Sequence, residues 1–138
     1  MSKTLFVELI TPQKERYAAE ADYVEAKGGS GSLGILPNHA NLLSTLESGE
    51  LKISDPHKVH YFAIGSGFLQ IRDNNVMILA SQAYRPDDVN IQSAVNEEKR
   101  LEEELSSVKE ISSRNNILSS LKMTKAMIAI ARREQSPE

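Results

Sequence analysis

The fold is decided by residues 28–51, which read Gly28-Gly29-Ser30-Gly31-Ser32-Leu33-Gly34-Ile35-Leu36-Pro37-Asn38-His39-Ala40-Asn41-Leu42-Leu43-Ser44-Thr45-Leu46-Glu47-Ser48-Gly49-Glu50-Leu51. A glycine cluster, a short apolar run, a proline corner and a second apolar run follow one another closely. Glycine permits backbone angles and close approaches that side chains forbid, and proline fixes one dihedral and removes a donor. This punctuation predicts a tightly folded β structure whose strands turn sharply and cross between sheets.

The same stretch also satisfies the dinucleotide-binding pattern G-x-G-x-x-G, at Gly29, Gly31 and Gly34. That pattern binds a pyrophosphate only where its last glycine opens a helix. Here Pro37 follows after three residues, and no apolar stripe of helical period comes next. We therefore interpret the glycines as parts of a β turn and reject a nucleotide-binding fold here.

Short strands are predicted on both sides of this stretch. Residues 5–10 and 23–27 alternate with period two, and residues 51–53 form a shorter strand. Two further runs, 61–64 and 68–71, are separated by Gly65-Ser66-Gly67, which predicts a bulge or a sheet corner. The unbroken apolar run 76–80 is typical of a buried strand. Many short strands separated by turns predict an antiparallel sandwich or barrel.

The composition changes at Arg85-Pro86-Asp87-Asp88, where a proline followed by two acids is a helix-start signal. Beyond this point glycine disappears, and apolar residues recur at three- and four-residue spacing. A polar break at Ile111-Ser112-Ser113 offers a second cap, so we expect two helices that fold back as an antiparallel hairpin. The first stripe is Ile91, Ala94, Val95, Leu101, Leu105 and Val108; the second is Ile117, Leu118, Leu121, Ile128 and Ala131.

Charge differs between the two predicted helices. Residues 87–110 carry eight acids against three bases, and residues 111–138 carry five bases against two acids. Opposite charge favours the folded hairpin, ordinary solvated faces are an equally simple interpretation, and a basic second helix could meet an acidic partner. Residues 126–131 are apolar all round the helix, so this segment either packs on the sandwich or docks on another subunit.

The bulk properties exclude several function classes. The net charge of −3 over 138 residues gives no reason to expect a nucleic-acid partner, and the absence of cysteine excludes disulfides. No apolar run approaches the roughly 20 residues that cross a bilayer, so we expect no direct membrane insertion. His39, His57 and His60 have no metal-ligand spacing, and the last two should point to opposite faces of a strand. Because no nucleophile elbow or phosphate loop is present either, we expect no enzyme.

The pattern Gly34-Ile35-Leu36-Pro37-x-His39-Ala40-x-Leu42-Leu43, followed by Gly49-x-Leu51-x-Ile53, resembles the N-terminal domain of the epsilon subunit of F-type ATP synthases. Residues 63–71 are similar to the family's Gly-Gly-Phe segment, and residues 75–80 to the strand that closes the domain. The resemblance covers most of residues 3–84. It implies an α+β fold: a sandwich of about ten strands at 1–86 and a regulatory helical hairpin at 87–138.

The resemblance also implies a role and partners. A chain of this family is a non-catalytic central-stalk rotor subunit that couples proton flow to ATP synthesis. It binds the gamma subunit and the c-subunit ring, and it needs no cofactor. It lies peripherally on the cytoplasmic face of the bacterial inner membrane, within the complex. In many members the hairpin extends along gamma, meets the alpha and beta subunits and inhibits ATP hydrolysis.

Site residues follow from the positions that match the family. The loop Gly31-Ser32-Leu33-Gly34 corresponds to the family's Gly-Glu-Leu-Gly, which approaches the c ring, and Ser32 replaces the glutamate. His39 matches the histidine near the gamma interface, although a satisfied turn histidine is an equal alternative. The basic residues of the second helix are candidates for an inhibitory contact with acidic surfaces of the beta subunit. They are Lys122, Lys125, Arg132 and Arg133.

Some members bind ATP on the folded hairpin through Ile/Leu-Asp-x-x-Arg-Ala. The equivalent here is Val89-Asn90-Ile91-Gln92-Ser93-Ala94, in which Asn90 replaces the aspartate and Ser93 the arginine. A serine cannot supply the cation that would pair with phosphate. The helix-two arginines of those members fall at Lys125 and Ala129. We therefore predict weak or absent ATP binding, and an ATP-sensing module with a degenerate site is the alternative function.

Overall fold

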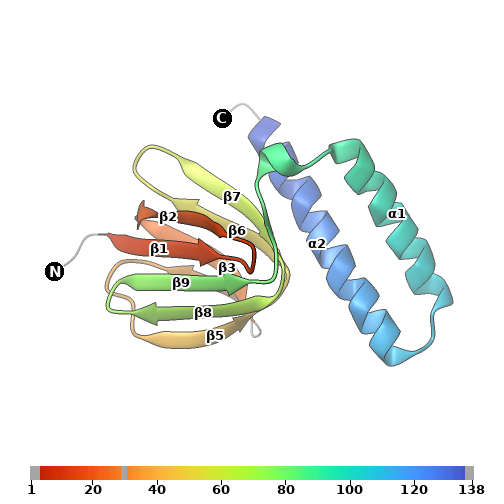
Figure 1. Cartoon of the computed structure of the whole chain (residues 1–138), viewed down its shortest axis with the longest axis horizontal. Helices are drawn as coiled ribbons and strands as arrows, with labels where there is room; N and C mark the ends of the chain where they lie inside the picture. The colour runs from red at the N-terminus through yellow and green to blue at the C-terminus, as the bar shows by residue number, and fades with distance from the viewer. Residues whose placement is uncertain (1–3, 29–30, 136–138) are drawn as a thin grey trace.

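Ten short strands fill the first part of the chain, and two long helices stand beside them (Figure 1). The computed structural model describes residues 4–28 and 31–135. The strands are β1 (Leu5–Ile10), β2 (Glu15–Ala21), β3 (Tyr23–Gly28), β4 (Gly31–Ile35), β5 (Leu42–Leu46), β6 (Gly49–Ser54), β7 (Val59–Ile64), β8 (Gly67–Arg72), β9 (Asn75–Ala80) and β10 (Ala83–Tyr84). The helical elements are a 3-10 turn η1 (Pro86–Asp88), α1 (Ile91–Ser107) and α2 (Ile111–Gln135).

The strands form two layers that are continuous with each other. One layer has the order β10-β7-β6-β3, with β4 paired to β3, and the other has the order β5-β8-β9-β1-β2. The layers join where Gly28 of β3 pairs with Leu46 of β5. The strands pair antiparallel except for β1 and β9, which run parallel. The predicted sandwich is thereby confirmed.

Period-two alternation places the core between these layers. In β1 the residues Leu5, Val7 and Leu9 are fully buried, and in β6 Leu51 and Ile53 are buried in the same way. Burial of apolar surface at roughly 25 cal/mol per Å² is the main stabilising contribution to such a core. The other large side chains of the described strands that are fully buried are Ile35, Phe62, Ile64, Leu69, Ile71 and Ile78.

Several strands carry too weak a pattern to be predicted from sequence. The edge strand β2 buries only Tyr17 and Ala21, and β10 has two residues. Strand β4 contains Gly31 and Gly34, which we had interpreted as turn residues; both lie in the strand that pairs with β3. Gly31 does have a positive φ of 127°, which favours glycine. Gly29 of the glycine pattern lies outside the described residues.

Two turns flank strand β8: the bulge or corner predicted at Gly65-Ser66-Gly67, and a turn that the composition of Asp73-Asn74-Asn75 also predicts. Asp73 and Asn74 both have positive φ and form the two-residue turn between β8 and β9, as a tight hairpin of primed type requires. Gly65-Ser66-Gly67 connects β7 in one layer to β8 in the other and is therefore a sheet corner. A Cβ on Gly67 would lie 1.8 Å from the carbonyl oxygen of Leu79, so the strands approach too closely there for any side chain.

The helices form the expected antiparallel hairpin. Buried residues on both helices meet in one cluster of Leu101, Ile117 and Leu121, flanked by Leu105 and Val108. The break between the helices was predicted three residues too late, because α1 ends at Ser107 and α2 begins at Ile111. Arg114 Nη1 stabilises the link by donating to the carbonyl oxygens of Leu105 (2.8 Å) and Val108 (3.0 Å).

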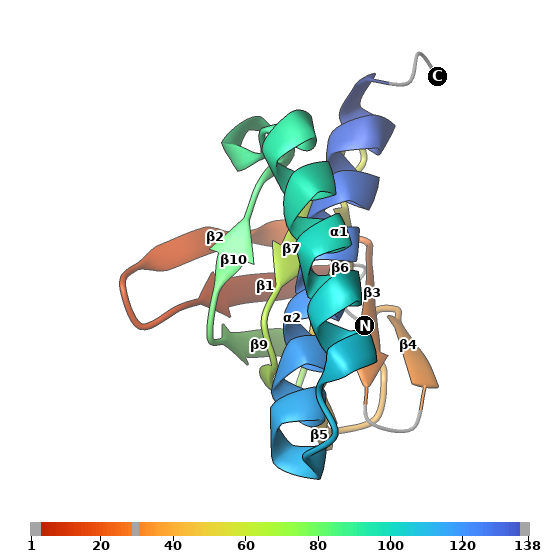
Figure 2. The ribbon, with the colours of Figure 1, turned by 90° about the vertical axis from the view of Figure 1, so that its right-hand side faces the viewer.

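Helix α2 lies between α1 and the sandwich (Figure 2), on the outer side of β6 and β7. Its residues Met123, Ala126 and Ile130 are buried against Ala63 of β7. The apolar segment 126–131 thus packs on the sandwich, which was one of the two alternatives for it. The exposed Leu118, by contrast, does not belong to the buried stripe.

The corner glycine yields a stability prediction. Gly67→Ala should lower the free energy of unfolding by about 1–3 kcal/mol, because a methyl group there collides with the backbone of β9. Urea unfolding measures the change. Ser66→Ala, which alters an exposed neighbour, is the control and should leave the urea midpoint unchanged within error. Equal midpoints for the two variants would contradict the proposed collision at position 67.

Candidate functional site

An exposed apolar surface covers the outer side of one layer of the sandwich. In β8 and β9 the inward residues Leu69, Ile71, Val76 and Ile78 are buried, and the residues between them face outward. Five large apolar side chains remain at least 37% exposed on neighbouring strands β1, β5, β8 and β9. They are Phe6, Leu43, Phe68, Met77 and Leu79, and we name them the apolar sheet face.

Strand register brings these side chains together. Phe68 lies opposite Leu79 in the β8–β9 pair, and Thr45 lies opposite Phe68 in the β5–β8 pair. Glu8 of β1 lies opposite Met77, so the apolar strip has a charged border. Leu43 lies opposite Gln70 and Phe6 opposite Asn75, so polar side chains are interspersed among the apolar ones. Exposed apolar side chains gathered on one side of a sheet are a candidate binding surface. Sequence analysis missed it, because we interpreted the apolar run 76–80 as a strand buried on both faces.

His39 lies in the loop that follows β4, at one end of the same layer. Its Nδ1 donates to the carbonyl oxygen of Ala40 at 2.7 Å, so the ring is satisfied locally. The loop is held to the β8–β9 turn, because Asn38 N donates to Asn74 Oδ1 (2.6 Å) and Asp73 N donates to Asn41 Oδ1 (3.1 Å). His39 therefore sits near the apolar sheet face rather than in it.

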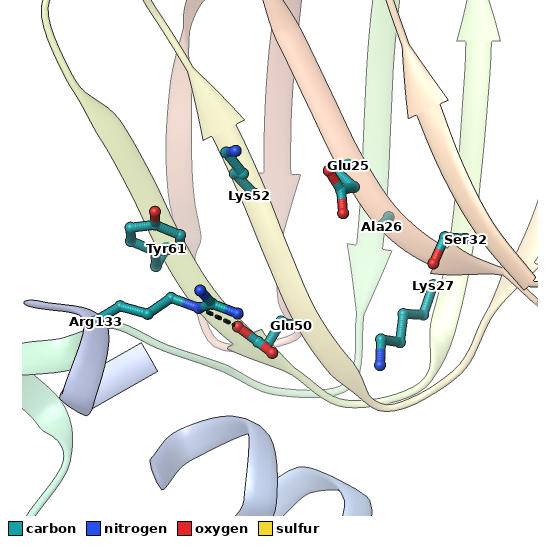
Figure 3. Close-up of a pocket in the computed structure, with 8 residues that line it drawn as sticks. All are labelled: Glu25, Ala26, Lys27, Ser32, Glu50, Lys52, Tyr61 and Arg133. Atoms are coloured by element: carbon teal, nitrogen blue, oxygen red, sulfur yellow. Dashed lines mark hydrogen bonds and ion pairs between the residues drawn. The ribbon is translucent and has the colours of Figure 1, made fainter. Parts of the chain in front are cut away.

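The predicted loop Gly31–Gly34 lies entirely within strand β4, which among the described residues pairs with β3 alone and forms a side hairpin of the sandwich (Figure 2). Gly31, Ser32 and Gly34 are exposed, and Leu33 is half-buried. Ser32 lies at the rim of a cavity of about 180 Å³ that also contains Lys27, Glu50, Tyr61 and Arg133 (Figure 3).

The four predicted basic residues of α2 divide into two pairs. Lys122 Nζ lies 2.6 Å from Glu47 Oε1, and Arg133 Nε lies 2.7 Å from Glu50 Oε1. Lys125 and Arg132 are exposed and have no ion pair with any residue that the structure describes. Two of the cations thus pair with the sandwich. Lys125 lines the groove beside Lys122 without an ion pair, and Arg132 is exposed.

The linker to the helices is held to strand β2. Arg16 Nη2 pairs with Asp88 Oδ2 at 2.8 Å, and Arg85 Nη2 donates to the carbonyl oxygen of Arg16 at 2.7 Å. The Arg85 guanidinium also lies 4.9 Å from the centre of the Phe62 ring. These contacts keep residues 85–88 on the sandwich, so α1 begins from a fixed point.

The start of α1 has the ordinary chemistry of a helix cap. Asn90 Oδ1 accepts a hydrogen bond from Ser93 N at 3.0 Å, which satisfies one of the free backbone donors of the first turn. Asn90 and Ser93 are the two positions that depart from the family's ATP motif. Both take part in this N-cap, and neither carries a positive charge.

The histidines have structural surroundings. His57 lies in the turn 55–58 and not on a strand, so the prediction of opposite strand faces was wrong. His60 Nε2 lies 2.9 Å from Asp55 Oδ2. This contact, together with the backbone N–H groups of His57 and Lys58, lowers the pKa of Asp55 to about 2. Within residues 4–28 and 31–135, no three potential metal-ligating side chains gather, and no helix is long and apolar enough to span a membrane.

Comparisons with known proteins agree with this architecture. The sequence model of the family described as "ATP synthase, Delta/Epsilon chain, beta-sandwich domain" matches residues 4–86. The ATP synthase epsilon chain of Desulforamulus reducens is 35% identical over 107 residues, which are 78% of this chain and 81% of the relative. The epsilon chain of Nitratidesulfovibrio vulgaris strain DP4 is 37% identical over 110 residues, 80% of this chain and 82% of the relative.

Solved structures share the fold. A chain of the Euglena gracilis mitochondrial ATP synthase superposes with a TM-score of 0.82 at 15% identity, covering 94% of this chain and 82% of that one. A chain of the Tetrahymena thermophila mitochondrial ATP synthase, from a structure of its central stalk and c ring, has a TM-score of 0.61 at 19% identity and covers 98% of both chains. Since the family's sequence model spans the whole sandwich and the relatives align over most of both chains, this chain belongs to the ATP synthase epsilon family.

Proposed function

We propose that this chain is a non-catalytic rotor subunit in the central stalk of a proton-translocating F-type ATP synthase, where it couples ion flow to ATP synthesis. The observation that carries the proposal is the apolar sheet face, a protein-binding surface on a stiff sandwich. The two relatives compared above are ATP synthase epsilon chains, which gives this surface its context. The subunit would lie peripherally on the cytoplasmic face of the bacterial inner membrane, held there by its partners.

The gamma subunit is the proposed partner of the apolar sheet face. Phe68 and Met77 are exposed side chains of types that are enriched at the cores of protein–protein interfaces. His39 lies near the end of this surface and would contribute at its margin. A rotor must transmit torque without shearing, and a sheet with a fully packed core beneath it meets that requirement.

The c-subunit ring is the proposed partner of the β3–β4 hairpin. Gly31, Ser32 and Gly34 present backbone and a hydroxyl group, so the contact would consist of hydrogen bonds and close packing and not of an ion pair with Ser32. The hairpin would act as an arm that leaves the apolar sheet face free for gamma.

The helices of residues 87–138 are the proposed regulatory part, and residues 1–86 the binding part. In an extended state, the cations Lys122, Lys125, Arg132 and Arg133 would meet acidic surfaces of the beta subunit and restrain ATP hydrolysis. Lys125 and Arg132 are the informative pair, because they are exposed in the folded hairpin and do not hold it in place.

The gamma contact is tested by a charge in the apolar sheet face. Phe68→Glu should weaken binding to the gamma subunit of the same enzyme about tenfold or more, because a carboxylate would be buried against an apolar partner. Titration calorimetry of the full chain with gamma measures the affinity. Leu118→Glu, at an exposed apolar site on α2, is the matched control; equal affinities for both variants would refute this docking surface.

The inhibitory role is tested by substituting the two basic residues of α2 that have no ion pair. Lys125→Gln/Arg132→Gln should raise the ATP hydrolysis rate of the assembled complex about two- to fivefold, since exposed ion pairs contribute up to roughly 1 kcal/mol each. The double variant should unfold at the parent's urea concentration. A hydrolysis rate equal to that of the parent complex would count against an inhibitory contact at these residues.

The chain is proposed not to bind ATP at micromolar concentrations, because Asn90 and Ser93 supply a helix cap in place of a phosphate-binding cation. Calorimetric titration of the full chain with ATP should give no saturable heat below about 1 mM. The variant Asn90→Asp/Ser93→Arg, which restores the family's motif, should bind more tightly than the parent. A micromolar dissociation constant for the parent would overturn the proposal and favour the ATP-sensing alternative.

A further inference from the structure

The contact between α2 and the sandwich has a narrow apolar centre. Four residues are buried in it: Ala63 on the sheet, and Met123, Ala126 and Ile130 on the helix. Two of the four are alanines, so the apolar area that each contributes is small. Half-buried residues surround this centre, among them Tyr61, Tyr84 and Met127. An interface of this kind needs further contacts to stay closed.

Ion pairs supply those contacts at both ends of the centre. Lys122 pairs with Glu47 in the turn between β5 and β6, and Arg133 pairs with Glu50 on β6 (Figure 3). The two cations are eleven residues apart, which is about 16 Å along a helix. The Arg133 guanidinium also lies 5.6 Å from the centre of the Tyr61 ring.

The partner of each group stabilises the charged forms of Glu47 and Arg133. The hydrogen bond from Lys122 lowers the pKa of Glu47, and the hydrogen bond to Glu50 raises the pKa of Arg133. Between the two ion pairs lies a groove of about 480 Å³ lined by Lys27, Lys125 and the small residues Gly49, Ala126 and Ala129. Glu47 and Glu50 are the carboxylates that line this groove.

We propose that Glu47 and Glu50 form an electrostatic latch that holds α2 on the sandwich and withholds Lys122 and Arg133 from any other acidic surface. In the docked state each cation lies 2.6–2.7 Å from a carboxylate of the sandwich, and an extended helix would carry it away from that carboxylate to a partner. The competition with a beta subunit rests on the proposed function; the latch itself concerns this chain alone.

The latch separates the roles of two sets of residues. Substituting the cations removes both the docked contact and the proposed inhibitory contact. Substituting the glutamates removes only the docked contact, so the hairpin should be released with its cations intact. Loss of two acids on the sandwich should therefore make the subunit a stronger inhibitor.

Thiol labelling of the isolated full-length chain tests the latch. The chain has no cysteine, and the buried Ser48 lies with its Oγ 3.3 Å from Ser119 Oγ on α2, so Ser48→Cys introduces one thiol that α2 covers. A chromogenic disulfide reagent should react with this thiol only when α2 has moved away from the sandwich. In this background Glu47→Gln/Glu50→Gln should raise the labelling rate about four- to twenty-fivefold, each pair contributing roughly two- to fivefold.

The controls separate a latch from a general change of charge. Glu25→Gln removes an acid from the cavity beside Arg133 whose carboxylate accepts a hydrogen bond from Tyr23 and not from α2, so it should leave the rate within about twofold of the parent's. The exchange Glu47→Lys/Lys122→Glu should restore slow labelling. Potassium chloride at about 1 M, where screening acts within roughly 3 Å, should speed labelling of the parent and leave the Gln/Gln variant unchanged.

Equal labelling rates for the parent and the Gln/Gln variant, after correction for reactivity in the urea-unfolded chains, would overturn the latch. In the assembled complex the Gln/Gln variant should lower the ATP hydrolysis rate. Faster labelling without that decrease would support the latch and count against the inhibitory role, so the two proposals fail separately.

Discussion

One constraint determines which side chains of the sandwich are buried and which are exposed: the two sheet layers must bury alternate side chains against each other. Strands β8 and β9 satisfy it with Leu69, Ile71, Val76 and Ile78, which turns the residues between them outward. On most sheets such outward positions are polar, but here Phe68, Met77 and Leu79 occupy them. The core and the apolar sheet face are therefore the two sides of the same strands, and neither can shift by one residue without exchanging places with the other.

The other layer meets a different neighbour. Its outer side carries Ala63 and Tyr61, and α2 packs against them. A small apolar centre flanked by ion pairs differs physically from the large apolar sheet face, because ion pairs exchange partners at low cost whereas buried apolar area does not. The two outer sides of the sandwich thus differ in chemistry: one carries exposed apolar side chains, and the other carries a small apolar centre flanked by ion pairs. The contacts among Arg16, Arg85 and Asp88 lie between these two sides and hold the linker on strand β2.

Local patterns in the sequence predicted much of this fold. Alternation predicted the strong strands, and the apolar stripes predicted the hairpin. The proline and acids at 86–88 predicted a helix start, but they form the 3-10 turn η1, and α1 begins at Ile91 after its cap Asn90. Strands β2, β4, β5 and β10 were not predicted. An edge strand with two buried residues, a glycine-rich strand and a two-residue strand have no pattern that is distinguishable from a loop, and β5 was recognised only as an apolar run. The apolar sheet face was missed for the opposite reason. The run 76–80 has a strong apolar signal, but a strand that is buried on both faces and a strand with one exposed apolar face have the same sequence pattern.

By itself the sequence determined the β-then-α order, the absence of cysteine chemistry and, through Gly-Ile-Leu-Pro-x-His, the family. Only the tertiary structure decided which apolar residues are core and which are surface, and which basic residues of α2 are already paired. Lys122 and Arg133 differ from Lys125 and Arg132 in nothing that a sequence pattern displays. They differ because Glu47 and Glu50, some eighty residues earlier, lie within reach of Lys122 and Arg133 only. Such long-range pairings depend on the packing of the whole chain, and local sequence carries no information about them.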